Sequence, residues 1–271
     1  MSSLSTATPS WLALRSSADR AARSTELAAL LARLLPPGPV VLHDLGAGTG
    51  GMTRWLAPRL PGPQEWVLRD GDPGILDHLD LDAVADDAGR PIRVTPVVEV
   101  LGELEPGAFA GASAVTASAL LDVVTREEAT RIVGACVAGG VPALFSLSVT
   151  GVVILDPPDA LDTALGDAFN AHQRREAGGR RLLGPDAAAI LAQRFADVGW
   201  HVRTASTPWR LGSADTPLTA AWLDGWVGAA VEQRPELADE AEAYLARRNA
   251  HLAAGALRVT VSHQDVLAWP G

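Results

Sequence analysis

Short apolar runs alternate with amphipathic segments from residue 10 to residue 149. The apolar runs predict strands at 40–44, 65–69, 92–98, 112–117 and 141–149. Apolar residues spaced three and four apart predict a helix capped by Ser10, a helix that starts at Ser24 or Thr25, and helices at 52–60, 73–84 and 125–138. This alternation predicts an α/β fold with a doubly wound, mostly parallel sheet and right-handed crossovers.

The simple alternation of strands and helices ends after the fifth predicted strand. Residues 152–184 form a long connection with a helical stretch, and insertions of this length at a sheet end are usually functional. The pattern then predicts a helix from Pro185, a strand at 200–211, helices at 216–232 and 235–252, and a last strand at 257–269. We therefore expect one domain, 1–271, with accessory helical segments at 1–35, 151–184 and 212–255 that form a lid.

Composition narrows the class of protein. The 271 residues are 48% hydrophobic and 20% charged, with a formal net charge of −10, which is typical of a globular domain and argues against a nucleic-acid partner. Lysine is absent, so no mechanism can use a lysine base. A single cysteine, Cys136, excludes disulfides, and the six histidines lack the spacing of metal ligands. No apolar run approaches the ~20 residues of a membrane span. We expect a cytoplasmic monomer or homodimer without a metal or a membrane partner.

The most informative motif lies where the first strand ends. Asp44-Leu45-Gly46-Ala47-Gly48-Thr49-Gly50 leads from an apolar strand into an amphipathic helix. Glycines let the backbone approach a ligand closely, and the free amides at the helix start face that ligand. Gly46, Gly48 and Gly51 also fit the dinucleotide spacing. Asp44 argues against a dinucleotide and favours a ligand with a cationic group, because a carboxylate repels a pyrophosphate and attracts a positive charge.

The pattern Asp-x-Gly-x-Gly-x-Gly resembles the first motif of the class I S-adenosylmethionine-dependent methyltransferases. The resemblance implies a seven-stranded sheet in the order 3-2-1-4-5-7-6 with the last strand antiparallel. It also implies methyl transfer from S-adenosylmethionine, with S-adenosylhomocysteine as product, to a small-molecule acceptor by in-line displacement. Whether oxygen, nitrogen or carbon is methylated stays open.

The resemblance also implies a set of cofactor residues, one group after each of the first four strands. Asp70 would accept hydrogen bonds from the ribose hydroxyls, and Glu99 would bind the adenine amino group. Arg69 departs from this pattern and could contact a 2′-phosphate in the dinucleotide alternative. The full predicted set is Asp44, Gly46, Ala47, Gly48, Gly50, Asp70, Gly71, Glu99 and Ser118.

Residues further along the chain are candidates for the acceptor site. His172 is the first candidate for a general base, because its intermediate pKa suits proton transfer. Asp122, after the fourth strand, is a second catalytic candidate. The substrate-binding candidates are Asn170, Gln173, Arg174, Trp209 and Arg210. Two other functions remain open at this stage: an NAD(P)-dependent oxidoreductase and a non-catalytic relative that only binds the cofactor.

Overall fold

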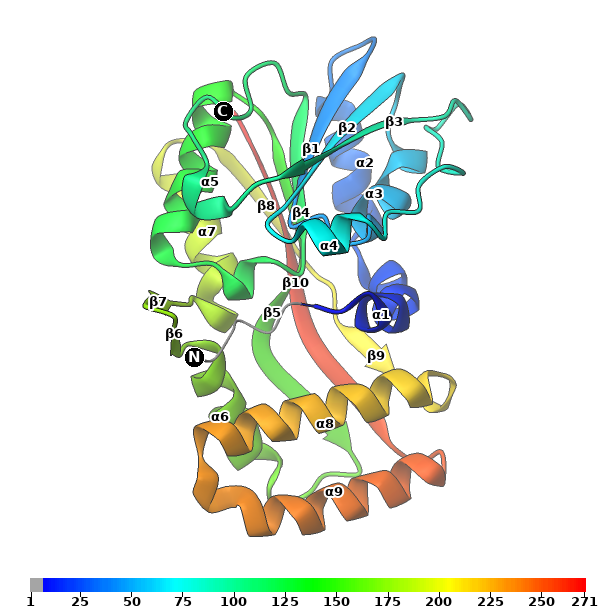
Figure 1. Cartoon of the computed structure of the whole chain (residues 1–271), viewed down its shortest axis with the longest axis vertical. Helices are drawn as coiled ribbons and strands as arrows, with labels where there is room; N and C mark the ends of the chain where they lie inside the picture. The colour runs from blue at the N-terminus through cyan, green and yellow to red at the C-terminus, as the bar shows by residue number, and fades with distance from the viewer. Residues whose placement is uncertain (1–6) are drawn as a thin grey trace.

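The computed structural model describes residues 7–271, which form a twisted sheet with helices on both faces and a second helical layer beyond one end (Figure 1). The helices are α1 (Pro9–Ala22), α2 (Thr25–Leu34), α3 (Gly51–Leu56), α4 (Pro73–Leu76), α5 (Arg126–Gly139), α6 (Asp162–Gln173), α7 (Ala187–Asp197), α8 (Thr216–Gln233) and α9 (Ala238–Ala253). The strands are β1 (Val40–Leu45), β2 (Gln64–Asp70), β3 (Arg93–Val98), β4 (Ala114–Ser118), β5 (Ala143–Asp156), β6 (Glu176–Ala177), β7 (Arg180–Arg181), β8 (His201–Ser206), β9 (Trp209–Leu211) and β10 (Arg258–Trp269).

The main sheet has the order β3-β2-β1-β4-β5-β10-β8. The first five of these strands pair in parallel, and β10 lies antiparallel between β5 and β8. In chain order the seven long strands give 3-2-1-4-5-7-6, so the predicted fold class and strand order are confirmed. The carboxyl ends of β1, β2 and β4 therefore meet at one edge, where α/β folds bind ligands.

Several predicted boundaries need correction. The helix predicted at 73–84 ends at Leu76, and the chain continues in turns that still bury Leu81 and Val84. Asp77, Asp80 and Asp82 favour turns over helix because short acidic side chains compete for backbone amides. The strand predicted at 200–211 is divided into β8 and β9 around Pro208, whose backbone has no N–H to donate to a ladder.

The fifth strand is longer than its apolar run. β5 continues to Asp156, and β10 pairs with it along almost this whole length. The two strands thus leave the main sheet and run into the layer formed by α6, α8 and α9 (Figure 1). A separate hydrophobic core, with Trp209, Trp222, Trp226 and Tyr244 among its buried residues, joins this layer to the strands. The accessory helices are therefore packed on the sheet's own strands.

Asp265 of β10 joins three parts of the fold. Leu147 has a left-handed φ of 56°, at an irregularity in the pairing of β5 with β10. The Asp265 carboxylate accepts its N–H at 2.8 Å and the N–H of Ser24, just before α2, at 2.9 Å. The hydroxyls of Ser146 and Thr207 donate to the same carboxylate. Four donors compensate for the burial of this acid, which connects the start of α2 to the sheet.

Helix ends follow the sequence closely. A capping box is present at the start of α5: the Glu128 N–H donates to the Thr125 hydroxyl at 3.1 Å, and the Glu128 carboxylate accepts from the Thr125 N–H at 2.8 Å. Between residues 7 and 271, no helix combines the length and the apolar character that crossing a bilayer requires.

Candidate functional site

The glycine turn after β1 needs its glycines for both conformation and space. Gly46, Gly48 and Gly50 have φ angles of +58°, +55° and +78°, and residues with a Cβ adopt such angles only with steric strain. A Cβ at Gly46 would lie 2.7 Å from Leu120, and one at Gly48 would lie 3.1 Å from Leu12. The glycines therefore leave the backbone of the turn uncovered, and a side chain here would be strained and would press on Leu120 or Leu12.

This turn forms one wall of a cavity of about 1130 Å³ along the carboxyl ends of the parallel strands. Pockets for one drug-sized ligand are roughly 300–1,000 Å³, so this cavity has room for a cofactor and an acceptor together. Gly50 lies outside its lining and provides the left-handed N-cap of α3. The predicted cofactor residues that line the cavity are Asp44, Gly46, Ala47, Gly48, Asp70, Gly71, Glu99 and Ser118.

Asp44 is a buried acid in the cavity wall, with 1% of its surface exposed. Its carboxylate accepts hydrogen bonds from the hydroxyls of Thr116, at 2.7 Å, and Thr53, at 3.3 Å. Burial raises the pKa of Asp44 to about 6, although these hydrogen bonds and the positive charge of Arg23 oppose the rise. A cationic group in the cavity would stabilise its ionised form.

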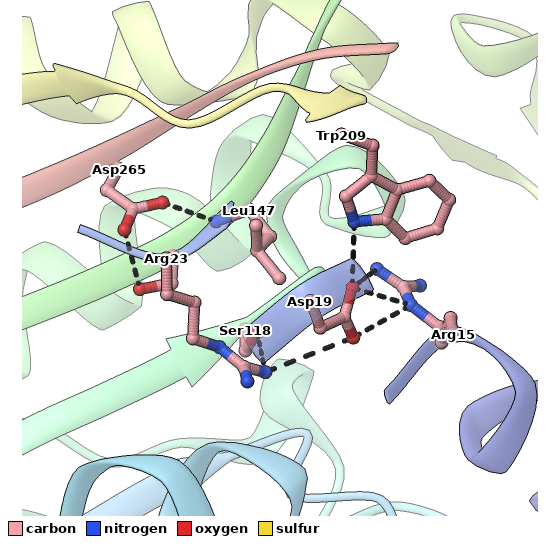
Figure 2. A network of polar contacts seen from close by, with 8 residues as sticks. Arg15, Asp19, Arg23, Ser118, Leu147, Trp209 and Asp265 are labelled. Carbon is pink, nitrogen blue, oxygen red and sulfur yellow. Dashed lines mark hydrogen bonds and ion pairs between the residues drawn. The ribbon is translucent and has the colours of Figure 1, made fainter. Parts of the chain in front are cut away.

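A charged stripe runs along α1 to its C-cap (Figure 2), and its three residues line the same cavity. Arg15, Asp19 and Arg23 lie four residues apart along this segment, and Arg15 donates to Asp19 at 3.0 Å. Arg23, only 6% exposed, donates to the Ser118 hydroxyl at 3.0 Å. Burial lowers the pKa of Arg23, while Asp19 opposes that shift. The buried Arg23 Nε has no hydrogen-bond partner among the described residues.

Arg23 is a site residue that the sequence pattern does not single out. The i, i+4 spacing of Arg15, Asp19 and Arg23 is visible as a charged stripe. Such a stripe usually faces solvent, and only the placement of α1 across the strand ends turns it toward the cavity (Figure 1).

The acid after β2 is fixed by the backbone. Asp70 accepts the N–H of Gly48 at 2.9 Å and that of Asp72 at 3.0 Å, so it links the glycine turn to the next strand end. Arg69 points elsewhere: it pairs with Glu99 at 2.6 Å and donates to His43 and the Ala108 carbonyl. Arg69 does not line the cavity, so it does not provide there the cation that a 2′-phosphate would need.

The two predicted catalytic residues both line the cavity, in different states. His172 has both ring nitrogens in contact: Nδ1 lies 3.1 Å from Arg175 and Nε2 lies 3.2 Å from Glu232. Burial and the neighbouring Arg175 lower the pKa of His172. Because a guanidinium can only donate, Nδ1 is the acceptor, and Nε2–H donates to Glu232. Burial raises the pKa of Asp122, which lies after β4.

The predicted substrate residues are divided between two locations. Asn170, Gln173 and Trp209 line a smaller cavity of about 170 Å³, which shares Gln173 and Asp122 with the large one. Arg174 is exposed and pairs with Asp186, at 2.6 Å. Arg210 is exposed on β9. The structure therefore leaves both arginines outside the two cavities.

No family model matches this chain, and no curated protein matches it. Among solved structures, it is similar to the mycolic acid cyclopropane synthase CmaA1 in complex with SAH and CTAB, at 15% identity and a TM-score of 0.48, over 89% of this chain and 82% of that one. It is similar to a SAM-dependent methyltransferase from Geobacter sulfurreducens in complex with S-adenosyl-L-homocysteine, at 15% identity and a TM-score of 0.45, over 97% and 99%. It is also similar to the YcgJ protein from Bacillus subtilis, at 11% identity and a TM-score of 0.48, over 90% and 98%.

The strand order itself defines the fold. Five parallel strands in the order 3-2-1-4-5 are followed by an antiparallel strand between the fifth and the sixth, which is the order that the sequence resemblance implied. The fold is a doubly wound, mostly parallel α/β sheet. This fold brings the glycine turn, Asp70 and Ser118 to one cavity from three separate strand ends.

Proposed function

We propose that the chain transfers a methyl group from S-adenosylmethionine to a small organic acceptor. The observation that carries this proposal is the pair of opposite charges beside the glycine turn: the buried Asp44 carboxylate and the buried Arg23 guanidinium line the same cavity. The amino-acid portion of S-adenosylmethionine is a zwitterion with one ammonium and one carboxylate. A pyrophosphate at the same turn would instead be repelled by two acids, Asp44 and Asp70.

The residues present fit this cofactor. Asp44 would accept a hydrogen bond from the ammonium, and the unpartnered Nε of Arg23 would donate to the carboxylate. Asp70 would accept from the ribose hydroxyls, and the glycine turn would leave room for the ligand above the backbone. Glu99 pairs with Arg69 through Oε2 and donates its N–H to the Asp70 carbonyl, so Oε1 is the atom that would accept from the adenine amino group.

The cofactor, when bound, supplies a methyl group activated by a sulfonium. The protein's contribution is then mainly positioning, which can supply about 7–11 kcal/mol of the barrier. Asp122 is the better base of the two predicted, because it lines both cavities, whereas both ring nitrogens of His172 are already in contact. His172 would instead shape the cavity wall.

Calorimetry on the purified protein tests the cofactor directly. S-adenosylmethionine and S-adenosylhomocysteine should bind, and NAD⁺ and NADP⁺ should not. Tight binding of either dinucleotide without binding of S-adenosylmethionine would refute the proposal.

A variant pair tests the charge argument. Arg23→Met should weaken S-adenosylmethionine binding by about 10- to 150-fold, the range for a charged hydrogen bond. The same variant should bind 5′-methylthioadenosine as tightly as the wild type does, because that molecule lacks the amino-acid carboxylate. Arg20→Met, an exposed position on the same helix, is the matched control.

A further inference from the structure

The smaller cavity is a side chamber of the large one. It has a volume of about 170 Å³ and shares Arg15, Ala119, Asp122, Phe169 and Gln173 with the cavity at the glycine turn. Its lining comes from α1, α6, α8, β5, β9 and β10, so it lies where the sheet meets the accessory helices. A molecule in this chamber would adjoin Asp122, which lines both cavities.

Aromatic rings form much of the chamber wall. Trp11, Trp209, Trp222 and Phe169 line it, with the Trp11 and Trp209 ring centroids 6.5 Å apart. The Arg15 guanidinium lies 4.8 Å from the Trp209 ring centroid, and its charge is already paired with Asp19 (Figure 2). Among the residues that the structure describes, the chamber thus offers flat apolar surface and no cation that is free to bind an anion.

Three buried polar atoms in the chamber wall lack partners within the described residues: Asn170 Oδ1, Gln173 Oε1 and His263 Nδ1. The Asn170 amide nitrogen donates to the Gly151 carbonyl at 2.8 Å, which leaves its oxygen as a free acceptor. Burial lowers the pKa of His263 to about 4, so its ring is neutral at pH 7. Nδ1 of a neutral imidazole can be donor or acceptor, whereas the two amide oxygens only accept. Buried polar atoms are nearly always paired in folded proteins, so the Asn170 and Gln173 oxygens point to a ligand that supplies donors.

We infer that this chamber is the acceptor subsite and takes a single aromatic ring that carries a hydroxyl or amino group. This inference rests on the proposed methyl transfer and names the acceptor class. The ring would pack on the tryptophans, and its O–H or N–H would donate to the Asn170 and Gln173 oxygens. An engineered apolar cavity of about 150 Å³ binds benzene, so the volume suits one six-membered ring.

Binding of four simple probes tests the inference on the unmodified protein saturated with S-adenosylhomocysteine. Phenol and aniline should bind at least about tenfold more tightly than toluene, because toluene leaves the wall acceptors unpaired. Phenol and aniline should also bind more tightly than cyclohexanol, which has a hydrogen-bond donor but no aromatic face. Toluene or cyclohexanol binding as tightly as phenol would overturn the inference.

A variant pair locates the binding. Gln173→Met keeps the length of the side chain and removes the acceptor, so phenol binding should fall about tenfold while toluene binding stays the same. Gln193→Met, at an exposed position on α7, should change neither. Equal phenol binding in wild type and Gln173→Met would place phenol elsewhere and refute the subsite.

Failure of this inference is distinguishable from failure of the proposed function. If S-adenosylhomocysteine binds and none of the four probes does, the cofactor assignment stands and the aromatic acceptor is wrong. Methylation of phosphoethanolamine, with no transfer to phenol or aniline, would lead to the same conclusion. If S-adenosylhomocysteine itself does not bind, the proposed function fails first.

Discussion

The two halves of the site are built in different ways. The edge at the glycine turn consists of backbone and short acids that follow directly after β1 and β2, within residues 44–72. The aromatic chamber is assembled from side chains as distant in sequence as Trp11 and His263. One half depends on a local motif and the other on tertiary packing. Substitutions should therefore separate the two halves. Changes at the turn should weaken cofactor binding and leave ring binding intact, and changes in the chamber should weaken ring binding and leave cofactor binding intact.

The largest effect is expected from Gly48→Val. A valine there would adopt a strained left-handed φ, and its Cβ would lie 3.1 Å from Leu12 on a surface that the ligand must approach, so cofactor binding should fall below detection by calorimetry. Phenol binding in the chamber should persist. Gly89→Val is the matched control, because Gly89 also has a left-handed φ, of +78°, but has open space around it. If both variants lose the cofactor equally, backbone strain is the cause, and the turn is not the binding surface.

A smaller but still large effect is expected from Asp122→Asn, at the junction of the two halves. Turnover of the acceptor that the probes identify should fall by about 10²–10⁴, the usual contribution of a general base, with cofactor affinity unchanged. His172→Gln should change turnover by less than about threefold, since neither ring nitrogen is free to accept a proton. A larger loss in His172→Gln than in Asp122→Asn would reverse the assignment of the base.

Asp70→Ala sharpens the description of the cofactor half. Loss of a charged hydrogen bond should weaken the binding of S-adenosylmethionine by about 10- to 150-fold. Unlike Arg23→Met, it should weaken 5′-methylthioadenosine as well, because that molecule keeps the ribose. Both affinities can be measured by calorimetry. Unchanged affinities would assign the ribose contact to another residue.

The smallest effect is a pH dependence from Asp44. Because burial raises the pKa of Asp44 to about 6, its carboxyl is mostly neutral at pH 5 and ionised at pH 7. Affinity for the ammonium-bearing cofactor should rise by about tenfold over this interval. Asp44→Asn should bind more weakly at pH 7 and lose the dependence. A wild-type affinity that is flat from pH 5 to 7 would show that Asp44 does not contact the ammonium.

The same residue affects the stability of the free protein with a defined sign. The folded state binds the Asp44 proton more tightly than the unfolded chain, whose pKa is 3.8. The free energy of unfolding therefore falls as pH rises from about 4 to about 6. Saturation with the cofactor should reduce this fall, which thermal melts across the same pH range can measure.

Local features were predictable from the sequence because neighbouring residues determine them. The glycine turn, the capping box of Thr125 and Glu128, and the alternation of strands and helices depend on short-range geometry. Asp44 was predictable for the same reason: its position two residues before Gly46 places it at the strand end.

Features that depend on long-range packing were not predictable. Arg23 reaches the cavity only because α1 crosses the strand ends, and His263 lines the chamber only because β10 pairs with β5 beyond the main sheet. The apolar residues at Leu81 and Val84 look helical, and they are buried by turns instead. Periodicity reports which residues are buried more reliably than it reports the backbone that buries them.

The bond between the Ser24 N–H and Asp265 has a consequence for the position of α1. The same helix has a second anchor, because the Trp209 Nε1–H donates to Asp19 at 3.0 Å. Both anchors come from strands near the end of the chain, β9 and β10, and Asp265 lies 241 positions after Ser24. The cavity wall that α1 provides is therefore held in place by residues far from it in sequence.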